Sequence, residues 1–154
     1  MNIRKLIVKE SRSWIGTKFH HQGRVRKSLT SLGGCDCLGL VIETAKTLDL
    51  KDKYGNKIAN LDEANYPIIP SGDYLYKKLA QHFKEKNLTN IAPGDIALFR
   101  FVKNPQHLAI IGEQRYDEHT HCTLIHSYSV SGFVCEHILN RKWQERLVAI
   151  FSII

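Results

Sequence analysis

The stretch Asp36-Cys37-Leu38-Gly39-Leu40 places a cysteine directly after an aspartate and directly before an apolar run. Aspartate is a favoured N-cap residue, because its carboxylate accepts hydrogen bonds from the first-turn N–H groups of a helix. The residues that predict the buried face of this helix are Leu38, Leu40, Val41, Ile42, Ala45 and Leu48. Cys37 is therefore expected at the positive end of a helix, where the unpaired N–H groups lower the pKa of a thiol and favour the nucleophilic thiolate. The alternative is a small, buried and unreactive thiol.

Two histidines far along the chain are candidate partners of this cysteine. His107 begins the apolar run 107–112, and His126 interrupts a second run, 123–128. Both runs are short, apolar or β-branched and bounded by polar turns, so they predict adjacent antiparallel strands. Paired strands would set the two imidazoles side by side, one as the base for Cys37 and the other as its orienter. The alternative is that either histidine is an ordinary strand residue.

The other segments predict an α+β fold in a single domain, 1–154, with helices packed on a central antiparallel sheet of about five strands. Residues 3, 6, 7, 14 and 15 suit an amphipathic N-terminal helix, and residues 71–87 suit a later one. The remaining strands are expected at 96–102, 132–139 and 146–154. A chain of 154 residues with 43% hydrophobic content can build one core of this kind.

The net charge of +7 does not predict nucleic-acid binding, because the basic residues are scattered and no basic motif is interleaved with aromatic residues. The densest basic patch, Arg24, Arg26 and Lys27, either attracts an anionic polymer such as cell wall or is a solvated loop. No apolar run is long enough to span a bilayer, and the charged N-terminus is not a secretion signal. We therefore expect no membrane partner, synthesis in the cytoplasm, and release by lysis or within a phage-like particle.

The four cysteines do not predict a disulfide framework, because no secretion signal accompanies them. A zinc site is a weaker alternative, since the candidate ligands match no common spacing and include no Cys-x-x-Cys pair. Those candidates are His119, His121, Cys122 and Cys135. Cys35 is expected to be a packed thiol. The sequence therefore predicts no metal and no cofactor.

Five short motifs, in one order along almost the whole chain, resemble the NlpC-type family of cell-wall cysteine peptidases. Gly16-Thr17-Lys18-Phe19 resembles the family's Gly-Thr-Pro-Tyr, and Asp36-Cys37-Leu38-Gly39-Leu40 resembles its Asp-Cys-Ser-Gly-Leu nucleophile motif. The other three motifs are Pro93-Gly94-Asp95, like the family's Pro-Gly-Asp turn, His107-Leu108-Ala109-Ile110, like His-Val-Gly-Ile, and Ile125-His126-Ser127, like Ile-His-Ala. The resemblance implies a papain-like fold with Cys37 as nucleophile, His107 as general base and His126 as orienting residue.

The same resemblance implies a reaction and a substrate. The expected reaction is hydrolysis of a peptidoglycan stem peptide through a thioester, most often between γ-D-glutamyl and a diamino acid. The stretch 19–24, Cys35 and the ending 143–151 are similar to the phage and gene-transfer-agent branch, which implies a tail-associated role in wall degradation and phage-like tail proteins as partners.

One departure from the family concerns the oxyanion site. The chain has Phe19 where the family usually carries a tyrosine, so the expected oxyanion or substrate-binding groups are the Cys37 N–H with His21 or Gln22, beside Asp36. The sequence is also compatible with two alternatives. One is a non-catalytic tail-assembly or wall-binding module on the same fold, and the other is a thiol amidase or acyltransferase.

Overall fold

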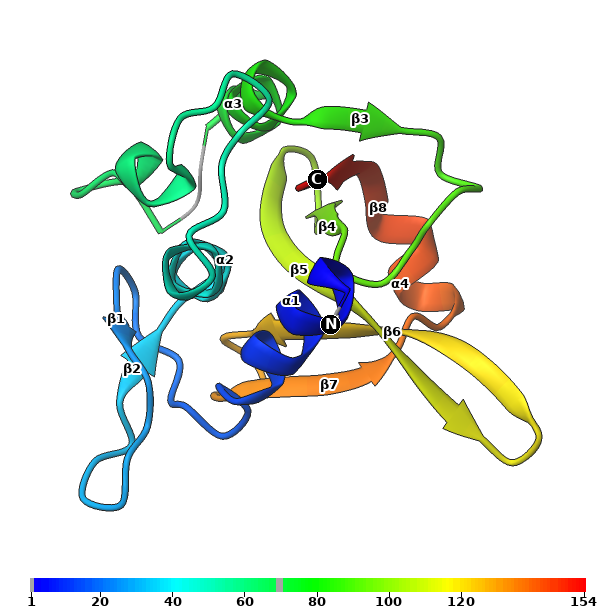
Figure 1. Ribbon diagram of the computed structural model, residues 1–154, viewed down its shortest axis with the longest axis horizontal. Coiled ribbons are helices and arrows are strands. Elements are labelled where there is room, and N and C mark those ends of the chain that lie inside the picture. The colour runs from blue at the N-terminus through cyan, green and yellow to red at the C-terminus, as the bar shows by residue number, and fades with distance from the viewer. Residues whose placement is uncertain (1, 69–70) are drawn as a thin grey trace.

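The computed structural model describes residues 2–68 and 71–154 (Figure 1). The helices are α1 (Ile3–Arg12), α2 (Cys37–Thr47), the 3-10 helix η1 (Ile58–Leu61), α3 (Tyr74–His82) and α4 (Arg141–Arg146). The strands are β1 (Arg24–Val25), β2 (Gly34–Cys35), β3 (Lys84–Lys86), β4 (Ile96–Arg100), β5 (Pro105–Tyr116), β6 (His119–Ser127), β7 (Val134–Ile138) and β8 (Leu147–Ser152).

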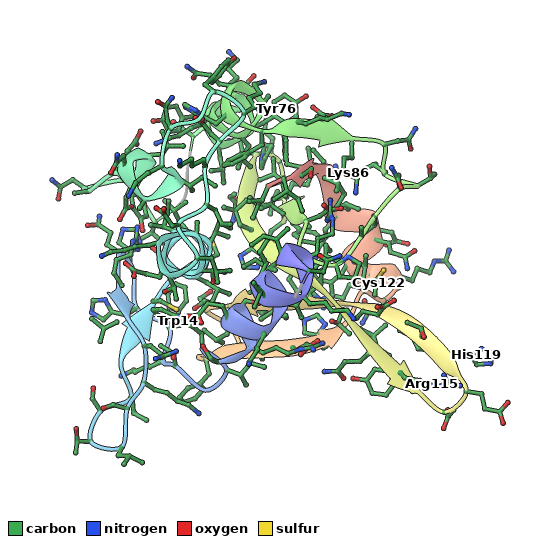
Figure 2. The ribbon with its side chains drawn as sticks, in the orientation of Figure 1. Trp14, Tyr76, Lys86, Arg115, His119 and Cys122 are labelled. Atoms are coloured by element: carbon green, nitrogen blue, oxygen red, sulfur yellow. The ribbon has the colours of Figure 1, made fainter. Side chains whose placement is uncertain are left out.

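Six of the strands form one antiparallel sheet in the order β3-β8-β4-β5-β6-β7, and β1 and β2 form a separate antiparallel pair. The long β5–β6 hairpin projects from the body of the molecule (Figure 1). Figure 2 shows Arg115 and His119 near the tip of this hairpin. The predicted α+β fold, with helices on an antiparallel sheet, is confirmed.

Two apolar clusters cover the two faces of the sheet, because neighbouring residues of a strand point to opposite sides. On β4, Ile96 and Leu98 belong to the cluster that also contains the buried residues of α1, α2 and α3. Ala97 and Phe99 belong to the second cluster, which α4 covers with Trp143. The sheet is therefore covered by apolar side chains on both sides.

The structure corrects one predicted helix. Residues 71–87 were expected to be helical, but α3 ends at His82 because the backbone of Phe83 turns extended and its side chain is buried in the core. Lys84 to Lys86 then pair with Ile150 to Ser152 as β3. This pairing supplies the sixth strand, so burial of one phenylalanine and pairing with β8 override the local helical pattern.

Within residues 2–68 and 71–154, no helix combines the length and apolar character that a membrane span needs.

Candidate active site

Cys37 is the first residue of α2, and Asp36 caps that helix by accepting a hydrogen bond from the Gly39 N–H at 2.8 Å. Gly39 is needed for space, because a Cβ there would lie 2.4 Å from the carbonyl oxygen of Gly23. The missing side chain lets the loop before β1 pack against the first turn of the helix. This packing fixes the position of Cys37 relative to the loop that carries His21 and Gln22.

The buried Asp36 carboxylate, 4% exposed, accepts hydrogen bonds from three further groups. These are the Gln22 N–H at 2.8 Å, Arg24 Nη1 at 3.1 Å and the Tyr66 hydroxyl. A buried carboxylate is tolerated when donors satisfy it in this way. An ionised carboxylate only accepts hydrogen bonds, so this arrangement suits Asp36 to holding the loop in place and not to donating to an oxyanion.

Three histidines form a hydrogen-bonded chain across β5, β6 and β7. His107 Nε2 lies 2.7 Å from His126 Nδ1, and His126 Nε2 lies 2.8 Å from His137 Nε2. His137 Nδ1 in turn lies 3.0 Å from the Ile138 carbonyl oxygen. The sheet therefore brings His107 and His126 together, as predicted from the sequence, and adds His137.

The Ile138 carbonyl fixes which nitrogen donates in each hydrogen bond of this chain, since a carbonyl oxygen can only accept. His137 Nδ1 must carry a hydrogen, so in the neutral ring its Nε2 accepts from His126 Nε2. His126 Nδ1 then accepts from His107 Nε2. The remaining nitrogen, His107 Nδ1, is left with a free lone pair, which is the tautomer that a general base requires.

Aromatic rings enclose His107 and His126. Trp143 packs edge-on against His126 at a centroid distance of 5.0 Å, and Tyr128 stacks on the same ring at 5.5 Å. Burial, with a smaller contribution from the nearby positive charge of Arg146, lowers the pKa of His107 to about 3. At neutral pH, His107 is therefore an uncharged imidazole.

Cys37 and His107 line the same cavity but are not hydrogen-bonded to each other in the described structure. The thiol of Cys37 interacts with the backbone of Leu108, the residue after His107. By alternation along β5, the His107 side chain lies on the α4 side of the sheet, whereas Cys37 comes from α2 on the other side. Cys37 thus contacts the backbone of β5 at Leu108, one residue after His107.

The structure corrects the expected pKa of Cys37. The sequence predicted a lowered value, but burial raises the pKa of this thiol to about 12, and the charge of Asp36 adds to the effect. Burial disfavours the charged form by more than the helix N-terminus favours it. The resting pair is therefore a neutral thiol and a neutral imidazole, not an ion pair.

This pKa predicts how Cys37 reacts with iodoacetamide. Because only the thiolate alkylates, the rate at Cys37 should rise roughly tenfold per pH unit from pH 6 to pH 9. Mass spectrometry of tryptic peptides would measure the rate at each cysteine, with Cys37→Ala as the assignment control. Fast labelling of Cys37 that is already constant near pH 6 would contradict the raised pKa and reinstate the ion pair.

The side chains of His21 and Gln22 contact the loop that carries Tyr66. His21 Nε2 and Gln22 Nε2 both lie within hydrogen-bonding distance of the Tyr66 carbonyl oxygen, at 2.9 Å and 3.0 Å. His21 and Asp36 line the cavity beside Cys37. The first-turn N–H groups of α2, which have no partner within the helix, are the donors closest in sequence to the thiol.

The cavity at Cys37 has a volume of about 780 Å³. One wall consists of apolar side chains from α2, η1, α3 and Phe83; they are Val41, Ile42, Ile58, Leu61, Leu75, Leu79 and Phe83. The other wall contains His107, Tyr128, Phe101 and Arg146. A ligand that fills this cavity would lie against Cys37, His107 and Arg146.

The structure separates most of the zinc ligands considered from the sequence. Cys122 is paired with Glu113 on β5, whereas Cys135 lies opposite His126 on β7. Among the described residues, one group has metal-ligand geometry, with His126, Cys135 and His137 offering atoms within 4.8 Å of one another. The short contact between the two Nε2 atoms in this group is the hydrogen bond of the histidine chain, which a metal would have to break.

Two residues of the site, His137 and Arg146, were not predicted from the sequence, whereas Tyr66 belongs to a segment, 66–70, that was expected to be an extended loop near the cleft; residues 69 and 70 lie outside the described residues. His137 had a usable signal, because alternation along β7 places residues 135 and 137 on one face. The hydrogen bond from the Tyr66 hydroxyl to Asp36 joins residues 30 positions apart and had no local signal.

No protein-family model matches the sequence, and no curated protein sequence matches it. Among solved structures, the chain is similar to an N-acetylmuramoyl-L-alanine amidase from Bacteroides uniformis. The TM-score is 0.54 over 96% of each chain, at a sequence identity of 16%. At this identity the likeness establishes a shared fold and nothing about activity, so the chain has the α+β fold of that amidase.

Proposed function

We propose that this protein is a cysteine hydrolase of peptidoglycan stem peptides, acting on the bond between γ-D-glutamyl and a diamino acid. The observation that carries the proposal is the directional histidine chain, which leaves His107 Nδ1 with a free lone pair, together with the cavity that both His107 and Cys37 line. A nucleophile, a base and an orienting group in one cavity are the components of acyl transfer. The five motifs that resemble those of NlpC-type peptidases support the proposed choice of bond. The similarity in fold to an N-acetylmuramoyl-L-alanine amidase supports peptidoglycan as the class of substrate.

In the proposed mechanism, the Cys37 side chain turns toward His107 when substrate binds, because catalytic hydrogen bonds often tighten only in the complex. His107 Nδ1 takes the thiol proton while the sulfur attacks the amide carbonyl carbon. The C–N bond then breaks, the His107 proton passes to the leaving amine, and a thioester remains on Cys37. Water attacks the thioester, gives its proton to His107, and releases the acid. The sulfur finally recovers that proton, and hydrolysis needs no metal.

The second candidate is an amidase that cleaves the N-acetylmuramoyl–L-alanine bond, favoured by the name of the structurally similar protein. The same catalytic groups could also pass the acyl group to an acceptor other than water. The histidine chain argues against a third candidate, a non-catalytic tail or wall-binding module, since binding alone does not require a base of defined tautomer. We further propose a phage-like particle as the setting, with tail proteins as partners and with synthesis in the cytoplasm.

Incubation of the reduced protein with defined muropeptides should give products cut between glutamate and the diamino acid, identified by mass spectrometry. Release of the intact stem peptide from the sugar would support the amidase instead. Cys37→Ala is the matched control and should leave the muropeptides intact. No cleavage by the wild-type protein, with the thiol shown to be reduced, would refute both hydrolase candidates.

A further inference from the structure

Arg146 is a charged residue of the cavity that the proposed mechanism leaves unused. It is the last residue of α4, and its guanidinium carbon lies 5.1 Å from the Phe101 ring centroid and 4.9 Å from that of Trp143. These two aromatic contacts hold the guanidinium in place. Its positive charge reaches His107, since it contributes to the low pKa of that imidazole.

The Nη1 atom of Arg146 is buried and has no hydrogen-bond partner among the described residues. Buried donors are nearly always satisfied in folded proteins, and a charged one left without an acceptor is costly. The other charged groups of the cavity wall are paired, Asp36 with Arg24 and Glu63 with Lys78. Arg146 is thus the cation of the described cavity wall that lacks a carboxylate partner.

We propose that Arg146 binds the free α-carboxylate of the γ-glutamyl residue whose side-chain carbonyl is attacked by Cys37. This inference rests on the proposed function. A γ-linked glutamate keeps its α-carboxylate free, a short carbon chain from the reacting carbonyl, whereas an α-linked glutamate does not. A planar guanidinium matches a carboxylate with two parallel hydrogen bonds. Arg146 would therefore select the γ linkage.

The placement of Arg146 has a second effect on the proposed reaction. In the free protein its charge opposes protonation of His107. A bound carboxylate would offset that charge just when His107 must carry a proton. Recognition of the substrate and activation of the base would then be coupled through one side chain.

Two tripeptides test this inference, L-Ala-γ-D-Glu-diaminopimelate and the same peptide with the α-carboxylate converted to an amide. The wild-type protein should have a kcat/KM about 10- to 100-fold higher for the acid, the effect expected of one charge-assisted pair. Arg146→Gln should lose that preference, and Arg146→Lys should retain part of it. The matched control is Lys142→Gln, an exposed position on the same helix with the same change of charge, which should keep the full preference.

An equal loss for both peptides in Arg146→Gln, or no preference in the wild type, would overturn the inference. If the wild-type protein cleaves neither peptide, the proposed function fails, and binding still tests the inference separately. Calorimetric titration of Cys37→Ala should then show tighter binding of the acid than of the amide, a difference that Arg146→Gln removes. Equal dissociation constants in Cys37→Ala would reject a carboxylate site at Arg146.

Discussion

His107→Ala is expected to reduce kcat on a cleavable muropeptide by about 10²- to 10⁴-fold, the contribution typical of a general base. The loss follows from the histidine chain, in which His107 Nδ1 is the nitrogen that is free to take the Cys37 proton. His126→Ala should cost less, about 10- to 100-fold, because His107 would remain but its ring would no longer be held in one orientation. Steady-state kinetics on the purified variants would measure both effects.

The control for this series is His119→Ala, which removes an exposed imidazole near the tip of the β5–β6 hairpin, away from the site (Figure 2). It should retain the wild-type rate. Thermal unfolding of each variant separates loss of the base from loss of the fold, since His107 packs against Phe99 and Trp143. A folded His107→Ala protein with wild-type kcat would remove His107 from the mechanism.

Asp95→Ala is expected to lower the free energy of unfolding by about 3–5 kcal/mol, the cost of removing one partner from a buried ion pair. The Asp95 side chain is fully buried and pairs with Arg4 Nη1 at 2.8 Å and Lys86 Nζ at 2.6 Å. It also accepts a hydrogen bond from the Ala92 N–H at 2.9 Å. The substitution would leave both cations unpaired and loosen α1, β3 and the turn before β4 together.

Urea denaturation should report this change as a lower midpoint, and thermal unfolding should shift on the order of 10 °C for a chain of this size. The matched control is Asp73→Ala, whose carboxylate is exposed and lies 3.4 Å from Lys77 one helical turn away. Exposed pairs of this kind contribute at most about 0.5 kcal/mol. If Asp95→Ala lowers the free energy of unfolding by as little as Asp73→Ala does, the pairs of Asp95 contribute no more than an exposed ion pair.

The features that could be predicted from the sequence are those with local signals. The capping aspartate, the apolar run after Cys37 and the alternating strands around residues 107 and 126 define α2, β5 and β6. Adjacent strands then bring His107 and His126 together, as the structure shows at 2.7 Å. Hairpin connections make this step possible, because consecutive strands usually pair.

The remaining features depend on contacts between distant segments. Lys84 to Lys86 become a strand because β8 lies beside them, and the protonation state of Cys37 depends on how deeply α2 packs against the sheet. The Tyr66 hydroxyl reaches Asp36 from a loop with no regular pattern. Burial and long-range pairing of this kind leave no mark in a short stretch of sequence, so the sequence could predict the position of the thiol but not its pKa.

The pairing register of β7 against β6 constrains the chemistry of the site. Alternate residues of a strand face opposite sides, so a slip of β7 by one residue against β6 would move His137 to the other face of the sheet. The chain would keep every histidine, yet the link from His126 to the Ile138 carbonyl would be gone and His107 could hold its hydrogen on either nitrogen. A register slip of one residue would therefore remove the fixed tautomer of the base without changing a single amino acid.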